Sequence, residues 1–221
     1  MKPYKLVRSR RRTIALVVSS DASLVVRAPL RASLEYIERV VRMKTEWIRR
    51  TMERVEARPR AGRKEFISGE SHLFLGRTYP LMVTRDADRA LSFQDGFFLN
   101  ERDRDRAGAL FMEWYKNEAR RRIPARVAEF AQRFGLAFRV IKIGSASKRW
   151  GSCSANGNLN FTWRLMMTPP SVIDYVVIHE LAHLEHKNHS KAFWKSVKCM
   201  CPDYAVSRRW LRENEGLVHP S

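Results

Sequence analysis

Cysteine, acidic side chains and long apolar runs are all scarce in this chain of 221 residues. The three cysteines, Cys153, Cys199 and Cys201, are too few and odd in number for a disulfide framework, so we expect a reducing, cytoplasmic setting. The apolar stretch 13–18 is too short for the core of a signal peptide, and no run approaches the roughly 18–20 residues of a membrane span. We therefore expect no membrane partner. Hydrophobic residues, at 44%, are nevertheless numerous enough for a folded core, which excludes a disordered chain.

The shortage of acidic residues leaves a large positive charge. The chain has 42 Lys and Arg against 23 Asp and Glu, a formal net charge of +19. The excess lies in residues 1–50, with 13 basic and 4 acidic side chains, and in residues 101–150, with 13 and 6. Such a field attracts polyanions. We expect DNA or nucleotide contact through these basic blocks; a solvated basic surface without a dedicated partner is the alternative.

The apolar pattern of the N-terminal half predicts short strands and one helix. Strands are expected at 13–18 and 23–27, and a hairpin is expected around Asp95-Gly96. Ser33 is the predicted N-cap of one long amphipathic helix over residues 34–56. The arginines of this helix form either a solvated face or a phosphate-binding face.

The C-terminal half is richer in helical periodicity. Residues 105–134 are predicted to be helical, with Pro124 marking a kink or a break between two helices and Gly135 as the C-terminal stop. Further helices are expected over residues 171–186, 190–199 and 203–214, and Ser171 is the predicted N-cap of the first. The whole predicts an α+β fold. We expect a strand-rich N-terminal lobe with one long basic helix over residues 1–100, and a second lobe with a small sheet over residues 101–221.

The motif His179-Glu180-Leu181-Ala182-His183 lies within the helix expected over residues 171–186. Histidines at positions i and i+4 share one face of a helix, so both imidazoles can reach one metal ion, and zinc favours nitrogen ligands. A metal in such a site lowers the pKa of a water from about 15.7 to roughly 7. Glu180, next to the first histidine, is then the candidate general base for hydrolysis.

A third ligand is needed, and His186 and His189 are the candidates. His186 follows His179 by seven residues, about 10.5 Å along a straight helix, which is too far for a single ion. His189 returns to the site only if the chain turns back after about residue 186. Lys187-Asn188 permits such a turn, because Asn tolerates left-handed backbone.

Longer stretches of the chain resemble the YgjP-like metallopeptidase family, a relative of the SprT-like (Spartan-type) zinc proteases. The resemblance begins at SRRRTIALVVSSDASLVVRAPLRASLEYIE and is densest in RWGSCSANGNLNFTWRLMMTPPSVIDYVVIHELAHLEHKNHSKAFW and CPDYAVSRRWLREN. It implies a zincin-like fold for residues 101–221. It also implies that His179, His183 and His189 hold zinc (Zn2+) and that Glu180 is the general base.

The resemblance further suggests a role for the segment Arg149-Trp150-Gly151-Ser152-Cys153. In a zincin-like fold a sheet edge runs beside the metal, where an extended peptide can add as a strand, so this segment is the expected wall of a substrate cleft. Plain core packing is the alternative for Trp150. Cys153 is a candidate reactive thiol or extra metal ligand, and a small buried side chain is the alternative. The sequence does not rank the candidates for stabilising an oxyanion, which are Arg149, Tyr204, Arg208 and Arg209.

Three functions fit these features. The first is a zinc-dependent metallopeptidase acting on protein or peptide, including proteins attached to DNA, as the SprT-like relatives do. The second is a metal-dependent nucleotide hydrolase, because some YgjP-like proteins are described as pyrophosphatases acting on UTP; the lack of a Walker-type loop and of a carboxylate cluster counts against it. The third is a non-enzymatic nucleic-acid-binding protein with a structural zinc, which requires a fourth protein ligand.

Overall fold

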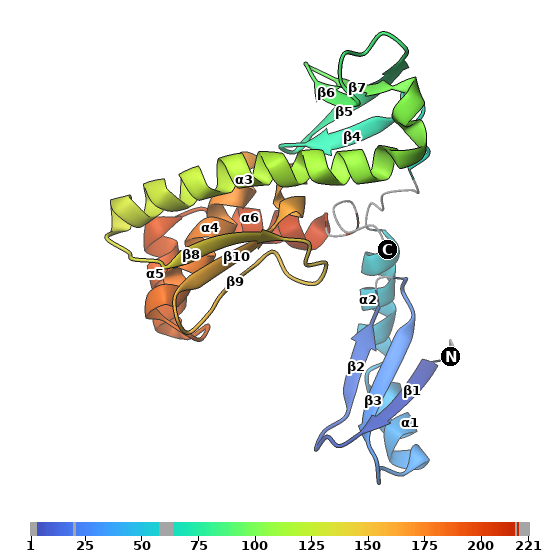
Figure 1. The fold of residues 1–221 in the computed structure, drawn as a ribbon. Helices are drawn as coiled ribbons and strands as arrows, with labels where there is room; N and C mark the ends of the chain where they lie inside the picture. The colour runs from blue at the N-terminus through green and yellow to red at the C-terminus, as the bar shows by residue number, and fades with distance from the viewer. Residues whose placement is uncertain (1–3, 20, 58–63, 215, 217–221) are drawn as a thin grey trace. The chain divides into compact units, whose positions relative to one another are not determined.

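The computed structural model describes residues 4–19, 21–57, 64–214 and 216. These residues form six α-helices and three small sheets, which confirms a mixed α+β fold (Figure 1). No helix among them is long and apolar enough to cross a bilayer. The chain divides near residue 60 into two compact units. This division differs from the predicted one at residue 100, since the strands between residues 71 and 100 belong to the second unit.

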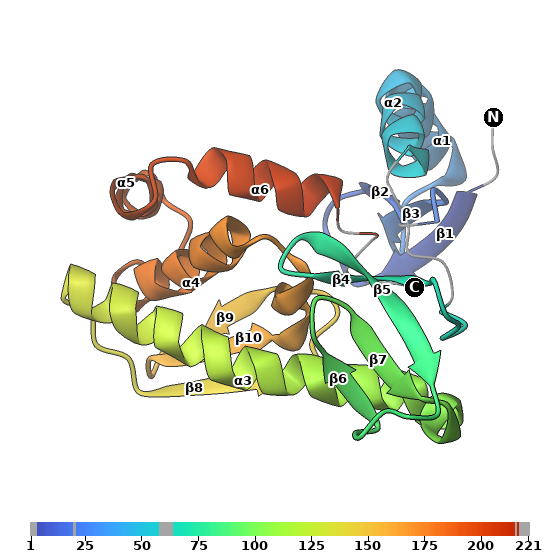
Figure 2. The same cartoon turned by 90° about the horizontal axis from the view of Figure 1, so that it is seen from above.

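The first unit is a three-stranded sheet covered on one face by two helices (Figures 1 and 2). Its strands are β1 (Tyr4–Ser9), β2 (Ala15–Val18) and β3 (Leu24–Pro29), in the order β1-β3-β2. β3 is parallel to β1 and antiparallel to β2. Alternate residues of β3 are buried against the helices, namely Leu24, Val26 and Ala28. The sequence pattern predicted β2 and β3 but not β1.

The predicted long helix of the first unit is two helices, α1 (Leu34–Met43) and α2 (Thr45–Glu56). Ser33 caps α1 as predicted, because its side chain accepts a hydrogen bond from the Tyr36 N–H. The helix is interrupted at Lys44, where φ is −109° and ψ is 12°. Thr45 helps to end α1, because its hydroxyl donates to the Arg42 carbonyl at 2.8 Å and so satisfies a terminal acceptor.

The second unit begins with a four-stranded sheet. Its strands are β4 (Ser71–Phe74), β5 (Arg77–Thr84), β6 (Leu91–Phe93) and β7 (Phe97–Asn100), in the order β4-β5-β7-β6. β6 and β7 are antiparallel across Asp95-Gly96, which confirms the predicted hairpin. The short 3-10 segment Glu101–Arg106 leads from this sheet into α3 (Ala107–Phe134), the longest helix of the described chain.

Pro124 was expected to mark a kink or a break, and the structure shows no break, because α3 continues through it as one helix (Figure 2). Buried apolar residues lie on both sides of the proline, including Ala119, Ile123 and Val127. Both halves of α3 therefore pack on the same core, and this packing outweighs the backbone hydrogen bond that proline removes. The helix ends at Gly135, whose left-handed backbone (φ 67°) is the predicted C-terminal stop.

A second small sheet and three helices complete the second unit. The strands are β8 (Val140–Gly144), β9 (Gly151–Cys153) and β10 (Asn158–Thr162), in the order β8-β10-β9, and a 3-10 segment (Trp163–Met167) follows them. The helices are α4 (Pro170–Glu185), α5 (Lys191–Met200) and α6 (Tyr204–Glu213). The predicted cap of α4 was wrong, because Ser171 lies inside the helix and Pro169 is the N-cap. Pro170 extends the helix by one position, since proline suits a first turn.

One core explains why strands β4–β7 belong with the later helices. The tip of the β4–β5 hairpin is hydrogen-bonded to the segment before α4: Leu75 N donates to Met166 O at 2.8 Å, and Gly76 N donates to Met167 O at 3.3 Å. A Cβ at Gly76 would lie 2.6 Å from Pro169, so glycine allows this close approach. Buried residues from Phe74 on β4 to Leu211 on α6 form one hydrophobic cluster.

Candidate metal centre

Helix α4 presents the two histidines of the motif from inside the core. Its side chains are apolar on nearly every side, and Val176, Val177 and Ile178 are all buried. A helix that is hydrophobic all round packs inside a protein. His179 and His183 are half-buried and lie one turn apart on the same face, with ring centroids 5.0 Å apart.

The chain turns back immediately after α4. At His186 the backbone is extended (φ −119°, ψ 97°), and α5 starts after Ser190, whose hydroxyl oxygen accepts from the Phe193 N–H at 3.3 Å. This return brings His189 to the motif, with its Nε2 3.1 Å from Nε2 of His179. The ligand atoms of His179, His183 and His189 all lie within 4.8 Å of one another.

His186 has a different place from His189. Its backbone carbonyl accepts a hydrogen bond from Nδ1 of His183 at 2.9 Å, and its ring is not part of the histidine cluster. A bond at Nδ1 leaves Nε2 of His183 as the nitrogen available to a metal, and it fixes the orientation of the ring. Of the two candidates for a third ligand, the structure brings only His189 to the cluster.

The three nitrogens fit a tetrahedral ion. A zinc–nitrogen bond of about 2.0–2.1 Å places neighbouring ligand nitrogens roughly 3.4 Å apart in tetrahedral geometry. The 3.1 Å between the Nε2 atoms of His179 and His189 is close to this value. Because all three ligand nitrogens lie within 4.8 Å of one another, small side-chain adjustments bring the third nitrogen to the same spacing. Neutral imidazoles are required for ligation, and burial lowers the pKa of His179 to about 3, with His183, His189 and Arg208 adding to the effect. Burial also lowers the pKa of His183.

Aromatic rings hold the histidines in position. Phe193 stacks on His183 at 4.5 Å and lies within 5.0 Å of both other imidazoles. Trp194 stacks on His189 at 5.7 Å. Nδ1 of His179 is buried with no hydrogen-bond partner among the described residues, so the packing of the ring and the contact of its Nε2 with His189 orient it. Phe193 and Trp194 therefore line the histidine cluster as well as packing in the core.

Glu180 lies against strand β9. Its side chain is only 5% exposed, and it packs on Gly151 so closely that a Cβ there would lie 2.6 Å from both Cγ and Oε1 of Glu180. Such a separation is far below normal carbon contacts, so only glycine leaves room for this carboxylate. The sequence analysis did not identify this role of Gly151; a glycine inside a strand is the signal that could have done so, since it often marks a close approach.

Burial also changes the acidity of this carboxylate. It raises the pKa of Glu180 to about 8, while the positive charge of Arg149 acts in the opposite direction. Desolvation disfavours the charged form of a carboxyl group. Without a compensating charge Glu180 is therefore mostly protonated at neutral pH. A positive charge nearby favours its carboxylate form, which is the form that accepts a proton as a general base.

Strand β9 is an edge of its sheet in the described chain. Thr162 N donates to Trp150 O at 3.0 Å, and Ser154 N donates to Asn158 O at 2.9 Å, so these residues form the hydrogen-bonded pairs with β10. Because pairing alternates in an antiparallel ladder, the N–H and C=O groups of Gly151 and Cys153 face away from β10. They are available to an extended chain beside Glu180.

The other residues singled out from the sequence have different surroundings in the structure. Trp150 is half-buried and packs against the core. Burial raises the pKa of the Cys153 thiol, which argues against a reactive thiolate. Arg208 lies 4.7 Å above the Trp194 ring, and Tyr204 stacks on the same ring at 5.4 Å. These two residues of α6 therefore pack on an aromatic ring that contacts the histidine cluster.

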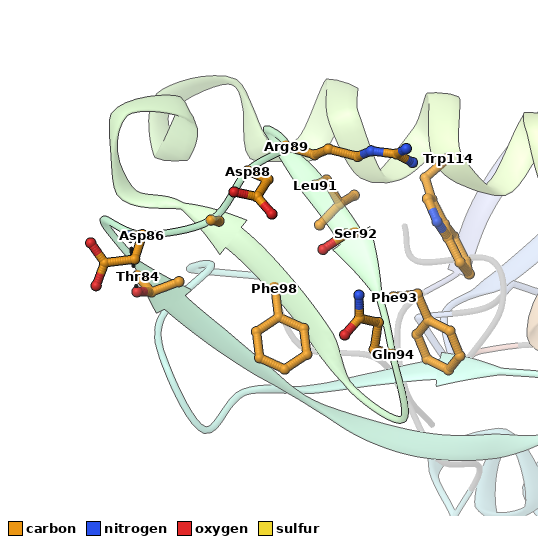
Figure 3. A pocket seen from close by; sticks show the side chains of 11 residues that line it. Thr84, Asp86, Asp88, Arg89, Leu91, Ser92, Phe93, Gln94, Phe98 and Trp114 are labelled. Atoms are coloured by element: carbon orange, nitrogen blue, oxygen red, sulfur yellow. Dashed lines mark hydrogen bonds between the residues drawn. The ribbon is translucent and has the colours of Figure 1, made fainter.

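A separate cavity lies in the first sheet of the second unit (Figure 3). Its volume is about 580 Å³, and its lining includes Asp86, Asp88, Arg89 and Trp114. None of its lining residues belongs to α4 or α5. In the described chain, His179, His183 and His189 are the group of side chains that converges as metal ligands would, so this cavity is not the metal centre.

Comparison with known proteins identifies one matching family. The family model described as the YgjP-like metallopeptidase domain matches residues 12–214. No curated protein matches the chain. Among solved structures, the metallopeptidase zymogen abylysin of Pyrococcus abyssi is 20% identical, covering 42% of this chain and 97% of that chain with a TM-score of 0.36. The zymogen jannalysin of Methanocaldococcus jannaschii is 18% identical, covering 40% and 94% with a TM-score of 0.32. Neither likeness is strong enough to support a conclusion about this chain.

Proposed function

The chain belongs to the YgjP-like metallopeptidase family, and on that premise we propose that it is a zinc-dependent peptidase with Glu180 as general base. His179, His183 and His189 would hold the metal. The observation that supports this proposal most is the convergence of three ring nitrogens within 4.8 Å beside a buried carboxylate. Three protein ligands rather than four are typical of catalytic zinc sites, which keep a position for water or substrate.

The chain's own residues account for substrate binding. The outward N–H and C=O groups of Gly151 and Cys153 bind an extended peptide as an added strand, which brings a scissile bond alongside Glu180. A zincin-like arrangement of the lobe over residues 101–221 is part of this proposal. A divalent metal held by the histidines supplies Lewis acidity to the scissile carbonyl and acidity to a water.

Glu180 moves the protons. Its carboxylate accepts a proton from the attacking water and delivers it to the leaving amide nitrogen, so that one residue is base first and acid second. Gly151 positions this carboxylate by leaving space for it. Arg208 is the best-placed cation to stabilise the negative charge that develops on the carbonyl oxygen, because it lies on the Trp194 ring and its charge already acts on His179.

The test compares wild type with Glu180→Gln, both loaded with zinc, on casein. Glu185→Gln is the matched control, because Glu185 is exposed and lies on the same helix. We expect Glu180→Gln to keep its metal and lose about 10²–10⁴-fold in turnover, as removal of a general base does. Glu185→Gln should retain wild-type turnover. Native turnover by Glu180→Gln would show that another group is the base.

The same proteins should be assayed for release of diphosphate from UTP. The peptidase proposal expects hydrolysis of casein and none of UTP. Release of diphosphate that depends on Glu180, without casein hydrolysis, would replace the peptidase by a nucleotide hydrolase at the same site. Zinc retention with neither activity, and a fourth protein ligand to the metal, would indicate a structural site.

A further inference from the structure

The sheet of the first unit has one face that neither α1 nor α2 covers. Register places the side chains of this face in two rows across the strands, Lys5–Val25–Val17 and Val7–Arg27–Ala15. Val7 and Val17 are 36% and 38% exposed, and Lys5 and Arg27 are also exposed. The alternate residues of β3 point the other way, into the helices. The open face therefore combines aliphatic side chains with cations.

An arginine-rich connection extends this face at one end. The segment between β1 and β2 contains Arg10 and Arg12, both exposed. It leads into Ala15, which pairs with Arg27, so the two arginines lie at the Arg27 end of the sheet. We define the sheet patch as Lys5, Arg10, Arg12 and Arg27. The neighbouring Arg8 is excluded, because its guanidinium donates to three backbone carbonyls, among them that of Ala32 at 2.7 Å.

The cations of the sheet patch differ from three arginines of the helices, Arg42, Arg49 and Arg50, which each have a carboxylate partner. None of the four forms an ion pair with a residue that the structure describes. On the helices, Arg50 lies 2.6 Å from Glu46, and Arg49 lies 2.8 Å from the same carboxylate. Arg42 lies 3.6 Å from Glu38. The charges of Arg42, Arg49 and Arg50 are thus neutralised locally. The charges of the sheet patch, like those of Arg39, Lys44 and Arg54 on the helices, are directed at solvent.

We propose that the sheet patch binds the phosphate backbone of nucleic acid. Unpaired arginines suit phosphate oxygens, which they can bind in bidentate fashion. The open face contains no aromatic side chain, so bases cannot stack on it as they do on single-strand-binding platforms. Contacts to phosphates position a protein without reading sequence. The binding is therefore independent of sequence and strongly weakened by salt.

This inference goes beyond the proposed peptidase function and moves the expected nucleic-acid contact. The arginines of residues 34–56 were one candidate for a phosphate-binding face. Three of them, Arg42, Arg49 and Arg50, form ion pairs with Glu38, Glu46 and Glu53, which favours the solvated alternative for their part of that surface. Phosphate binding by the sheet patch needs neither the metal nor Glu180.

The test uses the full chain and a labelled DNA duplex of arbitrary sequence, measured by fluorescence anisotropy between about 50 and about 200 mM salt. The patch variant is Arg10→Gln/Arg12→Gln/Arg27→Gln. The matched control is Arg42→Gln/Arg49→Gln/Arg50→Gln, which removes the same number of positive charges from the helices. Circular dichroism checks that both variants remain folded, and Lys5→Gln/Arg12→Gln is a second, milder patch variant.

We expect the patch variant to bind about tenfold or more weakly, with the slope of log K against log salt reduced by about 2–3, one phosphate contact for each arginine. The control should bind within about twofold of wild type. Equal losses in the two variants would overturn the proposal, because net charge alone would then explain binding. Binding of wild type to phosphatidylserine vesicles but not to DNA would also overturn it, and would identify an anionic membrane surface instead.

Discussion

The two units of the chain place their charged and ionisable groups in opposite environments. In the second unit Glu180 and His179 lie at the edge of a large core. Burial raises the pKa of Glu180 to about 8 and lowers the pKa of His179 to about 3. In the first unit the sheet patch is exposed, and its cations have no recorded partners among the described residues. Burial creates groups suited to chemistry, whereas exposure creates a field that attracts a charged partner. The proposed metal site and the sheet patch are therefore two separate sites.

The largest expected effect is that each of two variants loses one activity and keeps the other. Glu180→Gln should lower the rate of peptide hydrolysis by about 10²–10⁴-fold and leave DNA affinity within about twofold of wild type. The patch variant should weaken DNA binding and leave hydrolysis of a short uncharged peptide unchanged, because the sheet patch lies in the other unit. Measuring both activities on both variants tests the separation. If either substitution lowered both activities equally, the two sites would be one.

A smaller effect is expected from filling the space beside Glu180. Gly151→Ala would place a methyl group on the carboxylate and displace it, because a Cβ there lies 2.6 Å from Cγ and Oε1 of Glu180. We expect turnover to fall about 10–100-fold with metal content unchanged, since a small misplacement of a catalytic group has effects of this size.

Gly144→Ala is the control for this substitution. Gly144 lies on β8 of the same sheet and has no neighbour within 4 Å of the added atom. It should hydrolyse peptide at the wild-type rate. Equal rates for Gly151→Ala and wild type would contradict the positioning role of Gly151.

The smallest effect is a pH dependence of stability in the metal-free protein. The pKa of Glu180 is raised to about 8 in the folded chain from an ordinary value of 4.5, so the folded state binds more protons than the unfolded state between these values. The free energy of unfolding of the metal-free protein should therefore fall as pH rises from about 4.5 to about 8. The pKa of His179 is lowered to about 3 from 6.5, so its contribution is lost only as pH falls below 6.5.

Urea unfolding of the metal-free chain at pH 6.5 and pH 8 isolates the contribution of Glu180 when the change in wild type is compared with the change in Glu180→Gln. Wild type and Glu185→Gln should both be less stable at the higher pH. Glu180→Gln should show a smaller decrease, because glutamine does not titrate. An unchanged decrease in Glu180→Gln would show that another group causes the pH dependence.

Much of the fold and of the metal cluster follows from local sequence signals. Ser33, Gly135 and Asp95-Gly96 begin, end or turn their elements as predicted, because each acts on the backbone of its own neighbours. The spacing of His179 and His183 on a helix is equally local. His189 could be considered but not chosen from spacing, because its return depends on the turn between α4 and α5.

What the sequence could not predict depends on distant contacts. Pro124 predicted a kink or a break, and the shared core on both sides of it excludes the break by keeping α3 continuous. The division at residue 100 was expected from composition, whereas the hydrogen bonds of Leu75 and Gly76 join the earlier strands to the segment before α4. The role of Gly151 depends on Glu180, which follows it by 29 residues and meets it only in the folded chain.

Metal stoichiometry of the purified full chain tests the central claim most directly. After dialysis against trace zinc, elemental analysis should find one zinc per chain in wild type and in His186→Ala, whose ring lies outside the cluster. His189→Ala should lose at least about 100-fold in metal affinity, more than the 10–100-fold typical of residues that only orient a ligand. One tightly held zinc per chain in His189→Ala, or none in wild type, would contradict the account.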